Sequence, residues 1–250
     1  MLVFEDADIP QAIDTCAFAA FVATGQTCVS GARLLVHHSI FEDVRRRFVA
    51  KARAIRLGDP MDEDTQLGPL ISAQQQQRVQ AFVEEARREG ATVLCGGGPP
   101  GADALPPAIC GGFYFEPTVL GDVEPSMRVW REEVFGPVVC LVPFADEAEA
   151  VRLANDSPYG LGASIHTRDV KRAHRVADRI QAGIIWLNEH HRNAPSSPWG
   201  GVTAGSGLGR ENGWEAFAEY TQSKSVVVGY GDDRFDWYVD GAAARGVRYS

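Results

Sequence analysis

Segments with helical spacing alternate with short apolar segments along most of this 250-residue chain. In the first helical segment, Ile9, Ile13 and Ala17 recur at the spacing that places side chains on one face of a helix. Strands that alternate with helices form a sheet whose faces the helices cover. The order therefore predicts an α/β fold with a mostly parallel sheet. The expected helices span residues 8–23, 39–57, 72–89, 146–155 and 169–180, and the expected strands span residues 33–37, 92–95, 113–119, 138–143, 163–167 and 183–188.

Local signals place the ends of some of these elements. Ser39 and Glu42 have the spacing of a capping box, in which two side chains satisfy backbone N–H groups at the start of a helix. Ser72 and Gln75 repeat that spacing before the next helix. The run Gly183-Ile184-Ile185-Trp186-Leu187 is apolar throughout, which predicts a strand buried on both faces.

Two stretches rich in glycine indicate loops. Residues 96–112 combine glycine with proline and are expected to form an exposed loop. Residues 200–209 are similar to a phosphate-binding loop, but the best match to the dinucleotide fingerprint places Arg210 where its last glycine belongs. No clear strand precedes this stretch, and it is not a Walker loop. We therefore interpret it as a structural turn.

Composition excludes several classes of protein. With 45% hydrophobic and 23% charged residues, the chain has the composition of a folded domain and not of a disordered one. Its 33 acidic and 24 basic residues give a net charge of -9, which argues against a nucleic-acid-binding protein. The basic run Arg45-Arg46-Arg47 is interpreted as one solvated helix face. The chain has no apolar run of membrane-spanning length, and its first eight residues lack the basic region of a signal peptide. No membrane association is expected.

The five cysteines indicate reduced thiols in a cytoplasmic protein. They stand at positions 16, 28, 95, 110 and 140, and their odd count and wide spacing do not suit a disulfide framework or a zinc site. No metal is expected. Cys28 lies in the small-residue turn Gly25-Gln26-Thr27-Cys28-Val29-Ser30-Gly31, where backbone N–H groups could lower the pKa of a thiol or hold an oxyanion. The alternative is that Cys28 is a small buried residue. The other four cysteines lie in helical, strand or loop contexts without that glycine framing and are interpreted as structural.

Two polar motifs are further candidates for chemistry. Glu132 and Glu133 point opposite ways on an extended segment, so one could face a site beside Phe135 while the other pairs with Arg131. The run Glu189-His190-His191 lacks the spacing of a metal site and is interpreted as a polar loop after a buried strand. No nucleophile elbow of the serine hydrolases is present.

Together, these segments resemble the C-terminal half of the aldehyde dehydrogenase superfamily. The match runs over nearly the whole chain, and the order and spacing of its motifs are those of the family. The segments that carry it are Gly25-Gln26-Thr27-Cys28, Leu57-Gly58-Asp59-Pro60, Leu67-Gly68-Pro69-Leu70-Ile71, Phe115-Glu116-Pro117-Thr118-Val119, Glu132-Glu133-Val134-Phe135-Gly136-Pro137-Val138, Asn155-Asp156-Ser157-Pro158-Tyr159-Gly160-Leu161, Pro198-Trp199-Gly200-Gly201, Ser206-Gly207-Leu208-Gly209-Arg210-Glu211 and Tyr220-Thr221-Gln222-Ser223-Lys224.

The resemblance implies a role for four residues. Cys28 would be the catalytic nucleophile that attacks an aldehyde, and the resulting thiohemiacetal would lose a hydride to NAD or NADP and leave a thioester that water hydrolyses. Glu133 would hold the nicotinamide ribose, and Phe135 would pack near the nicotinamide. Trp199 would line the path of the substrate. The resemblance does not distinguish NAD from NADP and does not identify the aldehyde.

The family's nucleotide-binding half has no counterpart in this sequence. Also missing are the asparagine that completes the family's oxyanion hole and the glutamate that activates the deacylating water. The chain is expected to be either a natural half or part of a longer enzyme. Two alternatives stay open: a non-catalytic or partner-dependent subunit, and a cofactor-independent thiol esterase.

Two regions are expected along the chain. Residues 1–208 would form the thiol-bearing catalytic domain, and residues 209–250 would form a return segment with an oligomerisation strand at residues 225–230. Without partners these surfaces would be exposed and apolar. The expected partners are therefore a small aldehyde and either further copies of the chain or the missing half.

Overall fold

A seven-stranded sheet organises the computed structural model, which describes residues 1–101, 104–231 and 238. The strands lie in the order β3-β4-β5-β2-β1-β6-β7, and all neighbours are parallel except β3 and β4. The α/β class and the mostly parallel sheet are thus confirmed. The strands are β1 (Leu2–Val3), β2 (Arg33–His37), β3 (Thr92–Cys95), β4 (Thr118–Gly121), β5 (Val138–Phe144), β6 (Gly162–His166) and β7 (Ile184–Leu187).

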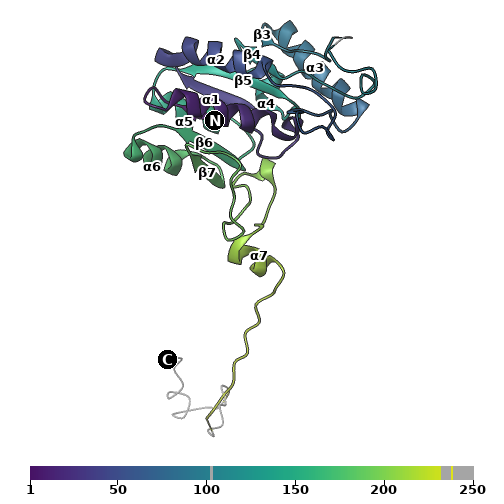
Figure 1. The fold of residues 1–250 in the computed structure, drawn as a ribbon. Helices are drawn as coiled ribbons and strands as arrows, with labels where there is room; N and C mark the ends of the chain where they lie inside the picture. Colours follow the sequence, from purple (N-terminus) through teal and green to yellow (C-terminus); the bar gives the residue numbers. More distant parts are fainter. Residues whose placement is uncertain (102–103, 232–237, 239–250) are drawn as a thin grey trace.

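Helices cover both faces of this sheet, as Figure 1 shows. Two separate apolar clusters fill the space between the layers. Alternate residues of one strand divide between them: Leu34 and Val36 of β2 belong to the cluster under α1 and α2, and Leu35 belongs to the other. The helices are α1 (Ile9–Phe21), α2 (Phe41–Arg53), α3 (Ala73–Glu89), α4 (Arg128–Arg131), α5 (Glu147–Asn155), α6 (Val170–Arg179) and α7 (Gly213–Glu219).

The two capping boxes have different outcomes. Ser72 does cap α3, because its hydroxyl accepts a hydrogen bond from the backbone N–H of Gln75 at 3.2 Å. The Gln75 side chain does not return the bond and instead reaches a distant loop. The prediction that Ser39 and Glu42 form a capping box is wrong. Helix α2 begins after a short 3₁₀ turn without a side-chain cap, and the Ser39 hydroxyl bonds the His37 ring instead.

Two strand predictions also need correction. The strand expected over residues 113–119 is found at Thr118–Gly121. The apolar run after Gly183 is not buried on both faces, because β7 is the edge strand of the sheet; only Trp186 is fully buried, and Leu187 is exposed. A run of apolar residues does not tell an edge strand from a central one.

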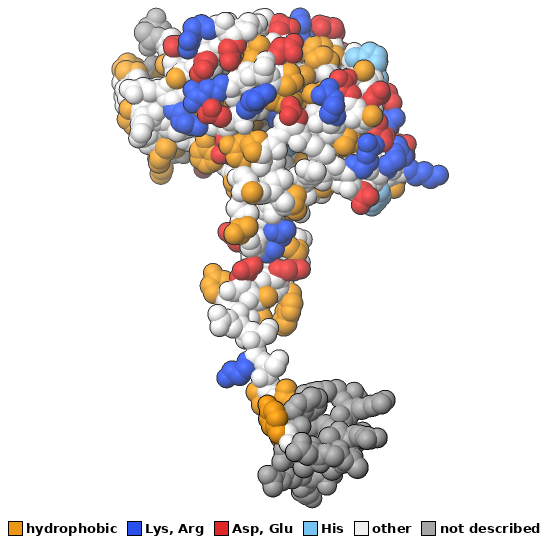
Figure 2. All heavy atoms as spheres, turned by 180° about the vertical axis from the view of Figure 1, so that it is seen from behind, with side chains coloured by type: hydrophobic (Ala, Val, Ile, Leu, Met, Phe, Trp, Pro, Cys, Tyr) orange, Lys and Arg blue, Asp and Glu red, His pale blue; other side chains and the backbone are white. Residues whose placement is uncertain are grey.

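A C-terminal arm projects from the sheet domain (Figures 1 and 2). It contains α7 and then the extended residues 221–231, and its exposed apolar side chains include Leu208, Trp214 and Val227. Residues 225–230 pair with no strand in the described part of the chain, so their expected role in oligomerisation stays a prediction. Trp199 and Glu211 exchange two backbone hydrogen bonds of 2.7 Å across the expected boundary at residue 208. Of the segment expected over residues 209–250, residues 232–237 and 239–250 lie outside the described residues.

Asp6 joins the end of β1 to the start of α6. Its carboxylate accepts hydrogen bonds from the Thr167 hydroxyl at 2.8 Å, from the backbone N–H groups of Arg168 and Asp169, and from the Arg172 guanidinium at 3.0 Å. Partial burial alone would raise the pKa of Asp6, but the Thr167 bond, the Arg172 charge and the backbone donors outweigh it and lower that pKa. The ionised form is therefore the one that the fold stabilises.

Replacing Asp6 by alanine is expected to lower the free energy of unfolding at pH 7 by about 2–4 kcal/mol, because several charge-assisted hydrogen bonds disappear together. Asp14→Ala is the matched control, since Asp14 is exposed and makes one ion pair, with Lys51 at 2.8 Å. Such a pair contributes at most about 1 kcal/mol. Urea titrations would measure both variants, and equal losses would contradict the role given to Asp6.

Candidate functional site

Three loops meet at one edge of the sheet. Each precedes a parallel strand: residues 22–32 lead into β2, residues 132–137 into β5, and residues 156–161 into β6. Because parallel strands begin at the same edge, these loops lie together although the chain separates them widely. The site is therefore at the amino-terminal edge, opposite to the carboxyl edge where open α/β sheets usually bind ligands.

The loop that carries Cys28 follows an abrupt end of α1. Ala23, Thr24 and Gly25 have φ values of 50°, 58° and 67°, a run of left-handed conformations that reverses the chain. The Ser30 N–H then donates to Thr27 O at 3.0 Å, and the Gly31 N–H donates back to Ala19 O of α1 at 2.9 Å. The result is a tight turn that leaves Cys28 exposed at its tip.

Gly25 lets this turn touch the loop before β5. A Cβ atom at Gly25 would lie 2.1 Å from Gly136 O, which is far inside van der Waals contact. Since Gly25 also has a φ of 67°, a side chain there is excluded both by backbone conformation and by space. The absence of a side chain at Gly25 therefore allows the thiol loop to pack directly against the backbone of the Glu133 loop.

Gly25→Ala is expected to destabilise the protein by about 3 kcal/mol or more and to disturb the labelling of Cys28 by iodoacetamide. Gly90→Ala is the control, because Gly90 has a φ of 110° and a Cβ atom added there would meet nothing within 4 Å. Its cost should be limited to backbone strain, about 1–2 kcal/mol. Thermal unfolding and peptide-resolved labelling would compare the two, and equal effects would argue against the contact with Gly136.

Helix α3 holds the segment that contains Glu133 and Phe135. The Gln75 side chain donates to Val134 O at 3.1 Å and to Phe135 O at 2.7 Å, and Arg78 donates to Glu133 O at 2.8 Å. Three successive carbonyl groups are thus tied to one helix face. Phe135 takes a φ of 58°, which turns its ring outward, and it remains partly exposed. It does not line the cavity described next.

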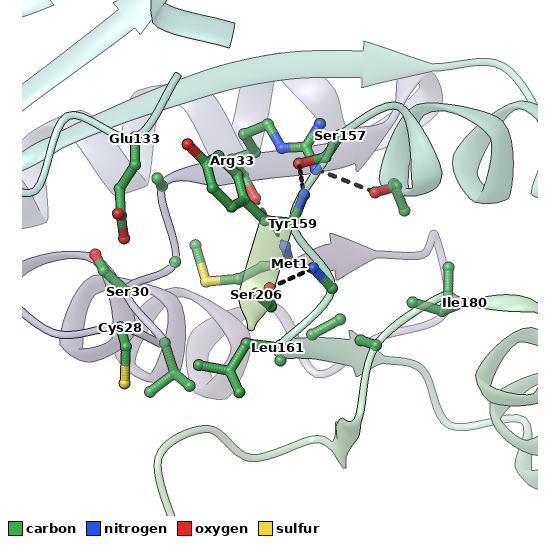
Figure 3. Close-up of a pocket in the computed structure, with 18 of the residues that line it drawn as sticks. Met1, Cys28, Ser30, Arg33, Glu133, Ser157, Tyr159, Leu161, Ile180 and Ser206 are labelled. Carbon is green, nitrogen blue, oxygen red and sulfur yellow. Dashed lines mark hydrogen bonds between the residues drawn. The ribbon is translucent and has the colours of Figure 1, made fainter. Parts of the chain in front are cut away.

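A cavity of about 330 Å³ opens beside Cys28. It extends between the starts of β2 and β6, where the two-residue β1 lies between strands of five residues. Cys28, Ser30 and Glu133 lie on one side of it in Figure 3, with Ser30 between the thiol and the carboxylate. The structure thus brings together two of the residues expected at the site, Cys28 and Glu133.

The surroundings of Glu133 favour its neutral form more than water would. Its side chain is open to solvent, yet the walls around it desolvate the carboxylate and raise its pKa, and the Arg78 charge offsets only part of that effect. A carboxylate held at a cavity wall can accept hydrogen bonds from hydroxyl groups. The neighbouring Glu132 is used differently: it pairs with Arg128 at 3.0 Å. The expected pairing with Arg131 is wrong, because Arg131 donates to Pro125 O.

Arg33 also lines the cavity, although no sequence motif marks it as a site residue. Its guanidinium is already occupied, since it donates to the carbonyl groups of Leu153, Ala154 and Asp156 at the end of α5. It also stacks on Trp130, 4.6 Å from the ring centroid. A cation at a helix C-terminus is a structural contact. Burial lowers the pKa of Arg33. Its hydrogen bonds to these carbonyl groups, and not a ligand, account for its position at the cavity.

His190 is placed differently from the expectation of a polar loop. It is 2% exposed, it lines the cavity, and its Nε2 lies 2.8 Å from Val29 O, next to Cys28. The Trp186 ring packs against it, with ring centroids 4.6 Å apart and 37° between the ring planes. Trp199 packs edge-on against Trp186 and does not line the cavity, so its expected contact with substrate stays a prediction.

The four cysteines other than Cys28 differ in their exposure to solvent. Cys16, Cys95 and Cys140 are buried, and burial raises the pKa of each thiol, to about 12 for Cys16 and Cys140. Cys110 is exposed, and its thiol contacts Pro107 O at 3.2 Å in its own loop. The residues that the structure describes contain no cluster of three metal-ligating side chains. Among those same residues, no helix has the length and apolar character needed to cross a bilayer.

An exposed thiol and a partly desolvated carboxylate thus lie at one cavity of an α/β domain, in loops at one edge of its mostly parallel sheet. The aldehyde dehydrogenase family model matches residues 1–226. A betaine aldehyde dehydrogenase from Brucella melitensis is 44% identical over 231 residues, which are 92% of this chain and 46% of the relative. The chain belongs to the aldehyde dehydrogenase family.

Solved structures agree with this assignment. Betaine aldehyde dehydrogenase from Staphylococcus aureus in complex with NAD+ superposes with a TM-score of 0.90 at 36% identity, over 96% of this chain and 46% of that one. An apo form of the same enzyme, carrying one substitution, also gives a TM-score of 0.90. The chain therefore spans about half the length of the relatives that it matches.

Proposed function

We propose that this chain is the thiol-bearing part of an NAD(P)-dependent aldehyde dehydrogenase and that Cys28 is its nucleophile. The observation that carries the proposal is the placement of an exposed Cys28 and of Glu133 at one cavity, in two loops that touch where Gly25 packs against the Gly136 backbone. The family match supports the same chemistry. Oxidation through a covalent thioester divides a difficult reaction into two easier steps.

Addition, oxidation and hydrolysis all take place on the aldehyde carbon while it is bound to the sulfur of Cys28. Its thiolate adds to the carbonyl carbon of the aldehyde to give a thiohemiacetal, whose oxygen the backbone N–H groups of the thiol loop would stabilise. Bound NAD(P)+ supplies the acceptor for the hydride that leaves this carbon. A thioester remains on Cys28, and water hydrolyses it to release the carboxylic acid and restore the thiol.

The residues present fit part of the cofactor. Glu133 can accept hydrogen bonds from the hydroxyl groups of a ribose, and the exposed ring of Phe135 can flank a flat heterocycle. The glycine-rich residues 200–209 do not provide a dinucleotide fingerprint, and Ser206 in that stretch accepts a bond from the Gly160 N–H instead. We infer that the nicotinamide end of the cofactor meets this chain and that the adenosine end is held elsewhere.

Turnover then needs the half of the family's fold that this chain does not match. Coverage of 46% of the Brucella relative and the exposed apolar arm both support that dependence. The completing half could belong to the same polypeptide or to a second chain, and the arm could also join copies of the protein. The free state of all five cysteines supports the expected cytoplasmic location.

The test measures aldehyde-dependent NADH formation in two mixtures. One contains this chain alone, and the other adds the separately expressed amino-terminal half of the Brucella relative. Betaine aldehyde and NAD+ are the first pair to assay, since relatives are named for that aldehyde and one is solved with that cofactor. Activity only in the second mixture is expected. Ester cleavage without NADH formation in either mixture would favour a thiol esterase, and no reaction of Cys28 at all would favour a non-catalytic subunit.

A further inference from the structure

We infer that His190 is a positioning residue for the nucleophile: its Nε2–H fixes the Val29 carbonyl and so holds the loop that presents Cys28. The inference rests on the proposed function, because it assigns His190 a role in presenting the thiol of that site. His190 follows β7 and Val29 precedes β2, 161 residues apart in the sequence, yet Nε2 and Val29 O are 2.8 Å apart.

The contact determines the tautomer of His190. A carbonyl oxygen can only accept a hydrogen bond, so Nε2 must carry the proton and Nδ1 must carry the lone pair. Nδ1 is buried and has no hydrogen-bond partner in the described part of the chain. A second proton would therefore be placed on a nitrogen without an acceptor, and burial accordingly lowers the pKa of His190 to about 4. At neutral pH the ring is an uncharged donor with one available bond.

Packing leaves the ring few other positions. The tilted ring of Trp186 packs against it, and the indole N–H of Trp186 donates to Arg192 O at 2.6 Å. Gly162 makes room for this arrangement, because a Cβ atom there would lie 2.8 Å from the Trp186 ring and 3.3 Å from the Val29 side chain. A close-packed cluster next to Cys28 thus forms from Val29, Gly162, Trp186 and His190.

The contacts of this cluster add to the hydrogen bonds that the thiol loop makes to α1. Those bonds run from the loop to Ala19 and Ala20, and they fix the end of the loop that leads into β2. The bond from His190 acts on the residue adjacent to Cys28. When it is lost, Val29 O becomes a buried acceptor without a donor, and the peptide group between Val29 and Ser30 can rotate to find one. The direction of the thiol then changes while the rest of the sheet domain stays folded.

The experiment compares His190→Gln with His190→Met in the full chain. The two side chains have similar length, but only glutamine keeps an N–H donor. Iodoacetamide labelling is followed by peptide-resolved mass spectrometry, and the rate at Cys28 is divided by the rate at Cys110, the other exposed thiol. His190→Met should lower this ratio about fivefold, the rate equivalent of one neutral hydrogen bond, and His190→Gln should keep it within about twofold of the parent.

Two results would overturn the inference. One is an unchanged ratio in His190→Met, or an equal loss in both variants, because then the donor does not matter. The other is labelling of the buried Cys16 and Cys140 in either variant, which would show that His190 stabilises the whole fold and does not position one loop. The test needs no cofactor, so a failure of the proposed dehydrogenase activity would leave its outcome readable.

Discussion

Cys28→Ala is expected to remove covalent chemistry from this protein. With the completing half present, aldehyde-dependent NADH formation should fall on the order of 10⁴-fold or more, because no other nucleophile can form the thioester. The chain alone allows a second assay of the Cys28 thiol. Its thiol should take the acetyl group of p-nitrophenyl acetate, releasing one p-nitrophenolate per Cys28 and leaving an acetyl thioester, and Cys28→Ala should lose this release.

Cys110→Ala is the matched control for that prediction. Cys110 is the other exposed thiol, and its Sγ bonds Pro107 O in a loop remote from the cavity residues. Its replacement should leave both reactions unchanged. If Cys110→Ala removed the stoichiometric release and Cys28→Ala did not, the nucleophile would be misassigned, and the cavity beside Cys28 would have no role in the chemistry.

Much of the fold follows from periodicity in the sequence. Residues 33–37 and 92–95 are strands with the expected bounds, and α5 and α6 begin one residue after the aspartates that cap them, Asp146 and Asp169. Periodicity does not reveal strand order, and β1 is too short to give a pattern. It therefore could not show that Leu2–Val3 lies inside the sheet or that β7 lies at its edge. Both facts depend on pairing between distant segments.

The site was harder to predict than the fold. The glycine-framed loop indicates that Cys28 can be reached, but Glu133 is far away in the sequence, and only the contact of Gly25 with Gly136 joins them. The resemblance to a family supplied that pairing. His190 was missed because Glu189-His190-His191 has the polarity of a solvated loop. The signal was indirect: Gly162 opens space for Trp186, and Trp186 then buries His190.

The protein should lose stability in mild acid because it buries neutral histidines. Burial, with repulsion from the nearby Met1 amino group and His190, lowers the pKa of His166 from 6.5 to about 3, and burial lowers that of His190 to about 4. The unfolded chain therefore binds more protons than the folded chain below pH 6.5. The contribution of the two histidines to stability is full above that pH and falls as the pH drops toward their folded pKa values. Each histidine contributes about 1.4 kcal/mol per pH unit, so the pair should cost about 5 kcal/mol by pH 4.5.

His166→Gln isolates half of this effect. The slope of unfolding free energy against pH between 6.5 and 4.5 should decrease by about 1.4 kcal/mol per unit relative to the parent. His174→Gln is the control, since His174 is exposed on α6 and should leave the slope unchanged. The carboxylates with lowered pKa values, Glu5, Asp6 and Glu147, act at lower pH, and the Met1 amino group contributes to parent and variant alike. Urea titrations at five pH values would give the slopes; an unchanged slope in His166→Gln would mean that His166 does not stay neutral in the folded protein and that the acid sensitivity in this range arises from His190 and the Met1 amino group.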